Sequence, residues 1–244
     1  MNYNLNHFKM GLERLHISLS EEQMNQFLTF YEMLIEKNKV MNLTAITEFE
    51  DVVEKHFLDS LSLVLSVDLD QPFTFIDLGT GAGFPGIPLK IAFPKLQVLL
   101  VDSLNKRIRF LQEVIDALEL KNCKAVHARA EELAAKAEYR EKFDFCVSRA
   151  VANLSTLSEY CIPFVKIGGQ FISYKSGECE EEVSSAKNAI FLLGGRQKDI
   201  LKFHLGENSR SLIIFEKVHS TPGKYPRCTG LPKKKSALGF QADF

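Results

Sequence analysis

Two aspartates and a run of glycines form the pattern in this sequence that is best suited to chemistry. Asp77 lies in the apolar segment 73–78, and three glycines follow closely: Gly79, Gly81 and Gly83. Glycines let the backbone turn tightly and let a ligand lie against it without Cβ atoms in the way. Asp102 closes the next apolar segment. An acid about 20 residues beyond the glycines is placed to accept hydrogen bonds from ribose hydroxyls, so we expect an adenosine derivative as ligand.

The charge beside the glycines indicates which adenosine derivative binds. The glycines formally match the dinucleotide pattern G-x-G-x-x-G at Gly81, Gly83 and Gly86. In a dinucleotide site, however, the first glycine of the pattern directly follows the strand, and the pyrophosphate sits on the helix N-terminus. Here Gly79 follows the strand, and Asp77 would repel a pyrophosphate. S-adenosyl-L-methionine carries a sulfonium, an ammonium and no phosphate, so it suits this site. A tight turn without a ligand is the alternative interpretation.

The elements that must position these residues alternate between strand and helix. Apolar runs predict seven strands, at 73–78, 97–101, 124–128, 143–148, 170–174, 197–205 and 209–218. Helical patterns fall between them, the first ending at Pro94 and the last spanning 178–193. The last two strands, joined by a short polar turn, predict a hairpin with a reversed edge strand. The expected fold class is therefore α/β, with one seven-stranded, mostly parallel sheet.

Residues 1–70 are predicted to form a helical cap over the ligand cleft. Two capping boxes are predicted to start its helices: Ser20 with Gln23, and Thr47 with Glu50. His56 and Asp59 lie three residues apart, on one face of the second helix. One His and one Asp make half a metal site at best, so a structural hydrogen bond is the favoured interpretation and no metal is expected.

Further candidate ligand contacts follow the later strands. Backbone amides around Ala130 and Glu131, after the third strand, are placed to read an adenine edge. Arg149 ends the fourth strand and would point into the crevice where α/β sheets bind ligands. A structural salt bridge to a neighbouring acid is an equal alternative for Arg149. Ser103 is placed to cap the next helix, whose first turns carry three cations that suit a partner or a solvated face: Lys106, Arg107 and Arg109.

The C-terminal tail, residues 219–244, carries the most one-sided charge. Between Lys217 and Lys235 there is no acid, and the cations are interleaved with prolines and glycines. We expect that such a segment cannot pack a core, which leaves either a solvated tail or a phosphate-binding arm. Because the whole chain has a formal net charge of −1, the arm is favoured. Its predicted RNA-binding residues are Lys224, Arg227, Lys233, Lys234 and Lys235.

Composition sets the broad class of the protein. With 45% hydrophobic and 25% charged residues, the chain is typical of ordinary soluble proteins. Its five cysteines show no CxxC spacing, which argues against a zinc site or a complete disulfide framework. The sequence shows no signal-peptide pattern and no apolar run long enough to span a membrane. We therefore expect a cytoplasmic monomer with no membrane partner.

Several motifs are spread along nearly the whole chain: Asn42-Leu43-Thr44, His56-x-x-Asp59-Ser60, the run from Asp77 to Pro88, Val101-Asp102-Ser103-x-x-Lys106-Arg107, Arg129-Ala130-Glu131 and Ser148-Arg149-Ala150. Together they resemble one family, RsmG/GidB, within the class I S-adenosylmethionine-dependent methyltransferases. The resemblance implies a Rossmann-like methyltransferase core over 71–218 and methylation of N7 of a guanine in 16S ribosomal RNA, within the small ribosomal subunit or before its assembly. By the family pattern the cofactor site is lined by Gly79, Phe84, Ala130, Glu131 and Arg149, beside Asp77, Gly81 and Asp102.

The chain departs from this family pattern in its tail. Cys228 stands where a lysine is common, and Lys233 where an asparagine is common. At these two tail positions the family pattern therefore does not carry over to this chain.

The expected chemistry agrees with the motifs that the sequence lacks. It has no Asn-Pro-Pro-Tyr for exocyclic amines and no Pro-Cys nucleophile for pyrimidine C5. Guanine N7 presents an unprotonated lone pair, so in-line attack on the methyl group requires no general base, and no catalytic residue is predicted. Catalysis would come from alignment and desolvation of two bound groups. Two rival functions remain: a nicotinamide-dependent dehydrogenase, and a non-catalytic RNA-binding or regulatory protein that keeps this fold.

Overall fold

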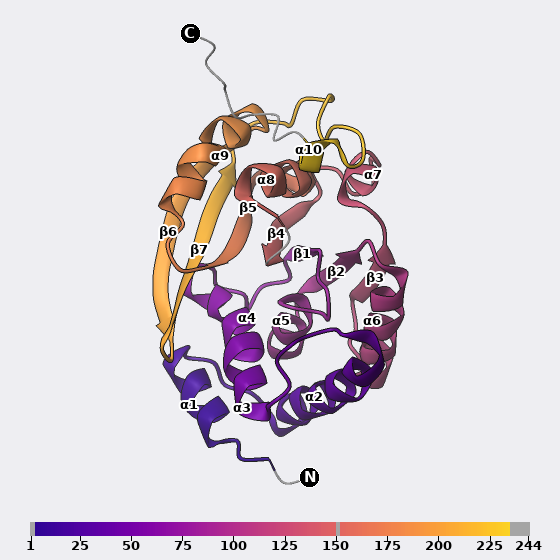
Figure 1. Ribbon diagram of the computed structural model, residues 1–244, viewed down its shortest axis with the longest axis vertical. Helices are drawn as coiled ribbons and strands as arrows, with labels where there is room; N and C mark the ends of the chain where they lie inside the picture. Colours follow the sequence, from indigo (N-terminus) through magenta and orange to yellow (C-terminus); the bar gives the residue numbers. More distant parts are fainter. Residues whose placement is uncertain (1–2, 150–151, 235–244) are drawn as a thin grey trace.

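A seven-stranded sheet runs through the middle of the molecule (Figure 1). The computed structural model describes residues 3–149 and 152–234. The strand order is β3-β2-β1-β4-β5-β7-β6. The strands are β1 Thr74–Leu78, β2 Gln97–Asp102, β3 Cys123–His127, β4 Phe143–Arg149, β5 Val165–Ser176, β6 Gly195–Leu205 and β7 Asn208–Lys217. The predicted α/β fold with a mostly parallel seven-stranded sheet is confirmed.

The prediction that the reversed strand lies at the edge of the sheet is wrong. β7 is antiparallel to both of its neighbours and lies between β5 and β6. The reason is burial, because the middle of β7 is apolar and buried from Leu212 to Phe215, whereas β6 exposes most of its first half. A strand that is buried on both faces needs neighbours on both sides, so the more polar β6 takes the edge.

Helices cover both faces of the sheet, and alternate side chains of each strand face opposite layers. Phe75 and Val98 pack into one hydrophobic cluster, which includes residues of α5 (Gly86–Ala92) and α6 (Asn105–Ala117). Ile76 and Leu99 pack into the other cluster. That second cluster includes residues of three further helices: α7 (Ala130–Ala134), α8 (Leu154–Cys161) and α9 (Glu180–Leu192).

The N-terminal helices share the first of these clusters with the sheet. They are α1 Asn6–Arg14, α2 Glu21–Met41, α3 Phe49–Val52, the π-helical turn η1 Val53–Leu58, α4 Asp59–Leu61 and the 3-10 turn η2 Ser62–Leu65. Phe30 and Phe57 reach the glycine run, with ring centroids 5.3 and 6.2 Å from that of Phe84. The cap therefore has no separate core, because its aromatic side chains pack on the loop that follows β1.

One of the two predicted capping boxes forms. Ser20 and Gln23 cap α2 reciprocally, as predicted. The box of Thr47 with Glu50 does not form, because α3 begins one residue later, with Glu48 as an N-cap that makes no side-chain bond. Thr47 instead offers its backbone carbonyl to the hydroxyl of Tyr31. In the part of the chain that the structure describes, none of the helices is both long enough and apolar enough to cross a lipid bilayer.

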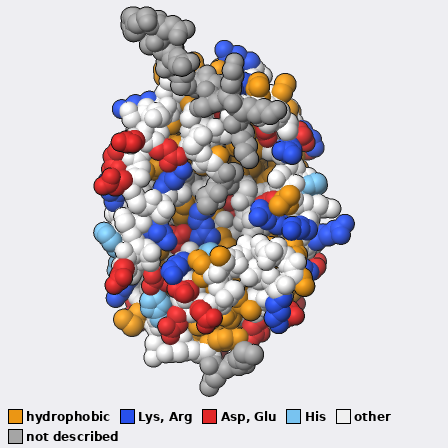
Figure 2. Space-filling model, viewed as in Figure 1, with side chains coloured by type: hydrophobic (Ala, Val, Ile, Leu, Met, Phe, Trp, Pro, Cys, Tyr) orange, Lys and Arg blue, Asp and Glu red, His pale blue; other side chains and the backbone are white. Residues whose placement is uncertain are grey.

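The expectation that the tail cannot pack is wrong for its described part. Thr221 and Tyr225 are buried. Arg140 donates hydrogen bonds to the backbone carbonyls of Thr221, at 2.8 Å, and Tyr225, at 2.9 Å. The tail then enters the short helix α10 (Leu231–Lys234) beside α8 (Figure 1). On the face shown in Figure 2, acidic and basic side chains are interspersed, as the near-neutral net charge of −1 suggests.

Candidate functional site

The glycine run forms a tight loop between β1 and α5. Gly79, Gly81 and Gly83 all adopt positive φ angles, of 70°, 63° and 102°, which favour glycine. The amides of Gly79 and Thr80 both donate to the carbonyl of Val101, at 2.8 and 3.1 Å, so the loop lies against the end of β2. At Gly86, a Cβ would stand 2.2 Å from a methyl of Leu100. Close packing therefore explains this last glycine better than a ligand does.

Asp77 supports this loop from beneath. Its Oδ2 accepts hydrogen bonds from Thr80 Oγ1, at 2.7 Å, and from the amide of Gly86, at 2.8 Å. The side chain is fully buried, and its Oδ1 has no hydrogen-bond partner among the residues that the structure describes. Burial raises the pKa of Asp77 from 3.8 to about 6. The carboxylate thus connects both ends of the loop.

Asp102 connects the loop to the next helix. Its Oδ2 accepts from the amide of Gly81, at 3.0 Å, and from Arg107 Nη1, at 3.2 Å, while its Oδ1 accepts from the amide of Leu104, at 2.8 Å. The prediction that Ser103 caps this helix is wrong, because α6 begins at Asn105 and its N-cap is Leu104. Arg107, one of the three cations near the start of α6, has an intramolecular partner in Asp102.

A pocket opens where β1, β2 and β3 end. We call it the β1–β3 pocket. Four of the predicted cofactor residues line it: Gly79, Asp102, Ala130 and Glu131. Apolar surface comes from the strand ends at Leu78 and Val101. The other predicted residues lie outside its lining: Gly81 bonds to Asp102 from the loop, Asp77 lies beneath the loop, and Phe84 and Arg149 lie beyond β1.

Sequence reasoning missed three residues that line the β1–β3 pocket: Leu157 and Tyr160 from α8, and Gly230 from the tail. The sequence does contain a pattern that predicts helix α8. Asn153 caps α8 by accepting a bond from the amide of Thr156, at 3.0 Å, and apolar residues follow at helical spacing. No sequence pattern predicts that Gly230 lines the pocket, because its position depends on how the tail folds back onto the domain.

The tail forms part of the wall of this pocket. The amide of Gly230 donates to Glu131 Oε1, at 2.9 Å. Arg227 binds the buried carboxylate of Glu159 on α8 through its guanidinium, with Nε 2.9 Å from Oε1 and Nη2 2.7 Å from Oε2, and its backbone amide also donates to Oε1, at 2.7 Å. Lys224 lies against the ring of Tyr225. For Lys233 and Lys234 only the backbone is described, and Lys235 lies outside the described residues.

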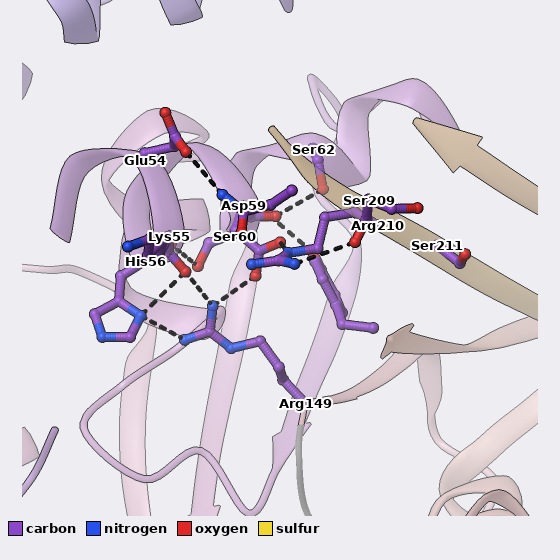
Figure 3. A network of polar contacts seen from close by, with 12 residues as sticks. Glu54, Lys55, His56, Asp59, Ser60, Ser62, Arg149, Ser209, Arg210 and Ser211 are labelled. Carbon is purple, nitrogen blue, oxygen red and sulfur yellow. Dashed lines mark hydrogen bonds and ion pairs between the residues drawn. The ribbon is translucent and has the colours of Figure 1, made fainter. Parts of the chain in front are cut away.

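Arg149 lies on the other side of the glycine loop. Its Nη1 binds Asp59 Oδ2, at 2.7 Å, and its guanidinium carbon lies 5.2 Å from the ring centroid of Phe84. Arg210 from β7 reaches the other oxygen of Asp59, at 3.0 Å (Figure 3). The structural salt bridge that was one of two alternatives for Arg149 is thus formed. Ala150, the last residue of its motif, lies outside the described residues.

His56 and Asp59 serve structural contacts, as favoured from the sequence. The ring of His56 stacks on Phe84, with centroids 4.5 Å apart, and its Nε2 lies 2.8 Å from Thr44 Oγ1. Burial, and then the charge of Arg149, lower the pKa of His56 from 6.5 to about 4, so the ring is neutral at pH 7. Within residues 3–149 and 152–234, no three His, Cys, Asp or Glu side chains come close enough to hold a metal ion.

Comparison with known proteins decides the family. Residues 23–213 match the family model described as GidB, rRNA small subunit methyltransferase G. This chain belongs to that family. Two relatives named ribosomal RNA small subunit methyltransferase G match this GidB-family chain nearly end to end. The one from Lachnoclostridium phytofermentans is 55% identical, over 93% of this chain and 95% of the relative. The one from Alkaliphilus metalliredigens is 50% identical, over 93% and 96%.

Solved structures place the GidB-family chain in a wider fold class. A SAM-dependent methyltransferase from Aquifex aeolicus is 18% identical, with a TM-score of 0.51, over 68% of this chain and 93% of that one. A variant of the 16S rRNA (adenine(1408)-N(1))-methyltransferase from Catenulisporales acidiphilia is 15% identical, with a TM-score of 0.53, over 63% and 93%. These similarities concern the fold alone, and they confirm the class I, Rossmann-like methyltransferase fold.

Proposed function

We propose that this chain transfers a methyl group from S-adenosyl-L-methionine to N7 of a guanine in 16S ribosomal RNA. The observation that carries the proposal is the β1–β3 pocket, where the glycine loop, Asp102 and the start of α7 meet at the carboxyl ends of the strands. Open α/β sheets bind their ligands at this edge. Membership in a family of small-subunit ribosomal RNA methyltransferases supports RNA as the substrate.

The residues of the β1–β3 pocket fit an adenosine. Leu78, Val101 and Leu157 offer apolar surface to a base. Asp102 accepts three hydrogen bonds within the chain, and an ionised carboxylate has about four lone-pair sites, so one site remains for a ribose hydroxyl. The backbone at Ala130 and Glu131 lines the same pocket, as proposed for the adenine edge.

Two predicted cofactor residues, Phe84 and Arg149, lie outside the lining of this pocket. The guanidinium of Arg149, at the end of β4, lies over the ring of Phe84 in the glycine loop, and β1 and β4 are neighbours in the sheet. We retain them in the proposed cofactor site at the end that faces the substrate. Direct calorimetric titration of Arg149→Ala with the cofactor tests this role, and an unchanged affinity would remove Arg149 from the cofactor site.

The proposed reaction does not require a general acid or a general base from the protein. S-adenosylmethionine supplies a methyl group activated by its sulfonium. Guanine N7 already carries a free lone pair, so none of the chain's side chains has to remove a proton. The chain's residues bind and orient: Asp77 holds the loop, Asp102 holds the ribose, and the surrounding apolar side chains exclude water. The target guanine must be unstacked or lie in a loop to enter the site.

We propose that the tail contributes RNA contacts through Lys224, Lys233, Lys234 and Lys235, with Arg227 also placing the tail on α8. Changing Lys233, Lys234 and Lys235 together to Gln should weaken RNA binding and flatten its salt dependence by about 0.7 per lost contact on single-stranded RNA. Cofactor affinity should stay the same.

A matched control for the tail variant removes three exposed lysines elsewhere, Lys9, Lys39 and Lys95. This control loses the same charge outside the tail. If the tail variant keeps the parental salt slope, or if both variants flatten it equally, the tail makes no specific RNA contact. The RNA surface would then have to be sought at Lys106, Arg107 and Arg109.

Methyl transfer from labelled cofactor to 16S ribosomal RNA and to small ribosomal subunits tests the proposed function, with mapping of the modified base. Label at a guanine N7 is the expected result. Binding of RNA without transfer would instead support the non-catalytic, regulatory alternative. We further propose that the chain acts as a monomer in the cytoplasm, where its substrate is assembled, and sedimentation at working concentration tests the monomer.

A further inference from the structure

A second pocket opens along the same edge of the sheet, where β4 and β5 end and β7 begins. Its volume is about 480 Å³. The register of the strands brings its walls together, because Arg149 pairs with Tyr174 and Ser176 pairs with Arg210. Lys55, His56 and Asp59 contribute from η1 and α4. We call it the basic pocket, after its four cations: Lys55, Arg149, Lys175 and Arg210.

The basic pocket holds more positive charge than its own carboxylate neutralises. Asp59 lies between Arg149 and Arg210 and binds one through each oxygen (Figure 3). The Asp59 side chain is only 5% exposed, and the two arginines are 16% and 19% exposed. Two guanidiniums thus share one buried carboxylate. A partly buried cluster with an unbalanced charge is stabilised when a counter-ion binds.

Two lysines extend this positive charge at the pocket. Lys175 binds Glu182, at 2.7 Å, and Lys55 binds Asp51, at 2.6 Å. Neither carboxylate belongs to the lining of the pocket, whereas both lysines do. His56 adds no charge at pH 7. The surface that a ligand meets in this pocket is therefore cationic.

We propose that the basic pocket binds an RNA phosphate next to the target guanosine, a step that rests on the function proposed above. The planar guanidinium matches a phosphate through two parallel hydrogen bonds. The pocket also lies beside the glycine loop, since Arg149 lies over Phe84 of that loop. β1 and β4 are neighbours at the point where the strand order reverses. A phosphate held here would place its nucleoside across that point from the cofactor.

Arg210→Gln tests the proposal, because Arg210 is far from the β1–β3 pocket in the strand order and reaches the basic pocket from β7. The KM for 16S ribosomal RNA should rise about tenfold, as expected for a lost hydrogen bond to a charged group. The salt dependence of RNA binding should flatten by about 0.7, and the Kd for S-adenosylmethionine should stay the same. Arg196→Gln on β6 is the matched control, because Arg196 is exposed, pairs with Glu216 and lies outside the pocket.

A second variant protects the test against misfolding. Lys55→Gln combined with Lys175→Gln leaves the two arginines on Asp59 in place and should also raise the KM for RNA. If the wild-type protein transfers no methyl group, the proposed function fails. If it does transfer, and both variants keep the parental KM and salt slope, the phosphate site is wrong and the proposed function stands. Loss of cofactor affinity in step with RNA affinity would likewise overturn the assignment.

Competition with inorganic phosphate distinguishes a site that binds RNA phosphates from one that binds only free anions. Added phosphate should compete with RNA in the wild type and less so in Arg210→Gln. If phosphate raises the thermal stability of the wild type while Arg210→Gln leaves the KM for RNA unchanged, the pocket binds free phosphate only, and the proposal is overturned.

Discussion

The β1–β3 pocket and the basic pocket lie on one edge of one sheet but carry opposite charge. The lining of the β1–β3 pocket has two carboxylates and one guanidinium, whereas that of the basic pocket has four cations and one carboxylate. Asp77, beneath the loop, adds a further acid on the first side. A cationic cofactor and a polyanionic RNA need opposite surroundings, and the sheet separates these surroundings by its strand order.

The two pockets also differ in what closes them. The described part of the tail contributes Gly230 to the β1–β3 pocket and holds α8 through Arg227. The basic pocket is instead built against the N-terminal helices, through Lys55, His56 and Asp59. The tail and the N-terminal helices thus each complete one of two pockets whose central part is the sheet. Variants at each boundary should therefore damage one pocket and spare the other.

The largest expected effect is at the tail's contact with α8. Arg227→Ala leaves Glu159, which is 1% exposed, without its counter-ion. Breaking a buried pair in this way should lower the free energy of unfolding by about 3–5 kcal/mol. Chemical denaturation measures this loss of unfolding free energy. Arg196→Ala is the control, since the exposed ion pair of Arg196 with Glu216 should contribute at most about 1 kcal/mol. Unchanged stability with weakened RNA binding would mean that Arg227 acts on RNA directly.

Asp77 should make the protein less stable as pH rises. Because burial raises its pKa from 3.8 to about 6, the folded state binds the proton more tightly than the unfolded chain. Its contribution to stability is full below pH 3.8 and is lost by pH 6, a change of about 3 kcal/mol. Asp77→Asn removes this contribution, so the stability of the variant relative to the wild type should rise by about that amount between pH 4 and 7. Denaturation curves between pH 4 and 7 measure it, and parallel curves for both proteins would refute the raised pKa.

His56, beside the basic pocket, should show the opposite slope. Its pKa is lowered from 6.5 to about 4, so the unfolded chain binds the proton more tightly. The contribution of His56 to stability should therefore fall by about 3 kcal/mol as pH falls from 6.5 to 4, so the wild type should lose that much relative to His56→Gln. The two slopes nearly cancel in the wild type, so the single variants are needed to separate them. If His56→Gln keeps the wild-type pH profile, His56 titrates normally.

The smallest expected effect concerns Asp102. If its remaining lone pair accepts a ribose hydroxyl, Asp102→Ala should weaken cofactor binding by about 1–3 kcal/mol. RNA affinity, which we place on the basic pocket and the tail, should change little. Calorimetry with the cofactor measures the effect, and a folded variant with parental affinity would remove Asp102 from the site. Glu113→Ala on α6, where the exposed Glu113 pairs with Lys37, serves as the control.

The sequence alone determined the central part of the site, from Asp77 through the glycines to Asp102. These residues belong to a strand, a turn and the next strand, so local spacing decides where they lie. Seven strands were predictable for the same reason, because each is a short apolar run between turns. Local patterns failed to place two helix starts, because the N-cap in the structure lies one residue after the predicted cap, as at Thr47 and Ser103.

Only the tertiary structure decided which distant residues meet. Asp59 receives Arg149 and Arg210, which are 90 and 151 residues away along the chain, because the end of β4 and the start of β7 lie at the same edge of the sheet. Gly230 reaches Glu131 across 99 residues for a similar reason. No spacing rule connects such pairs. Their meeting depends on the order of strands in the sheet, and burial of β7 between β5 and β6 set that order.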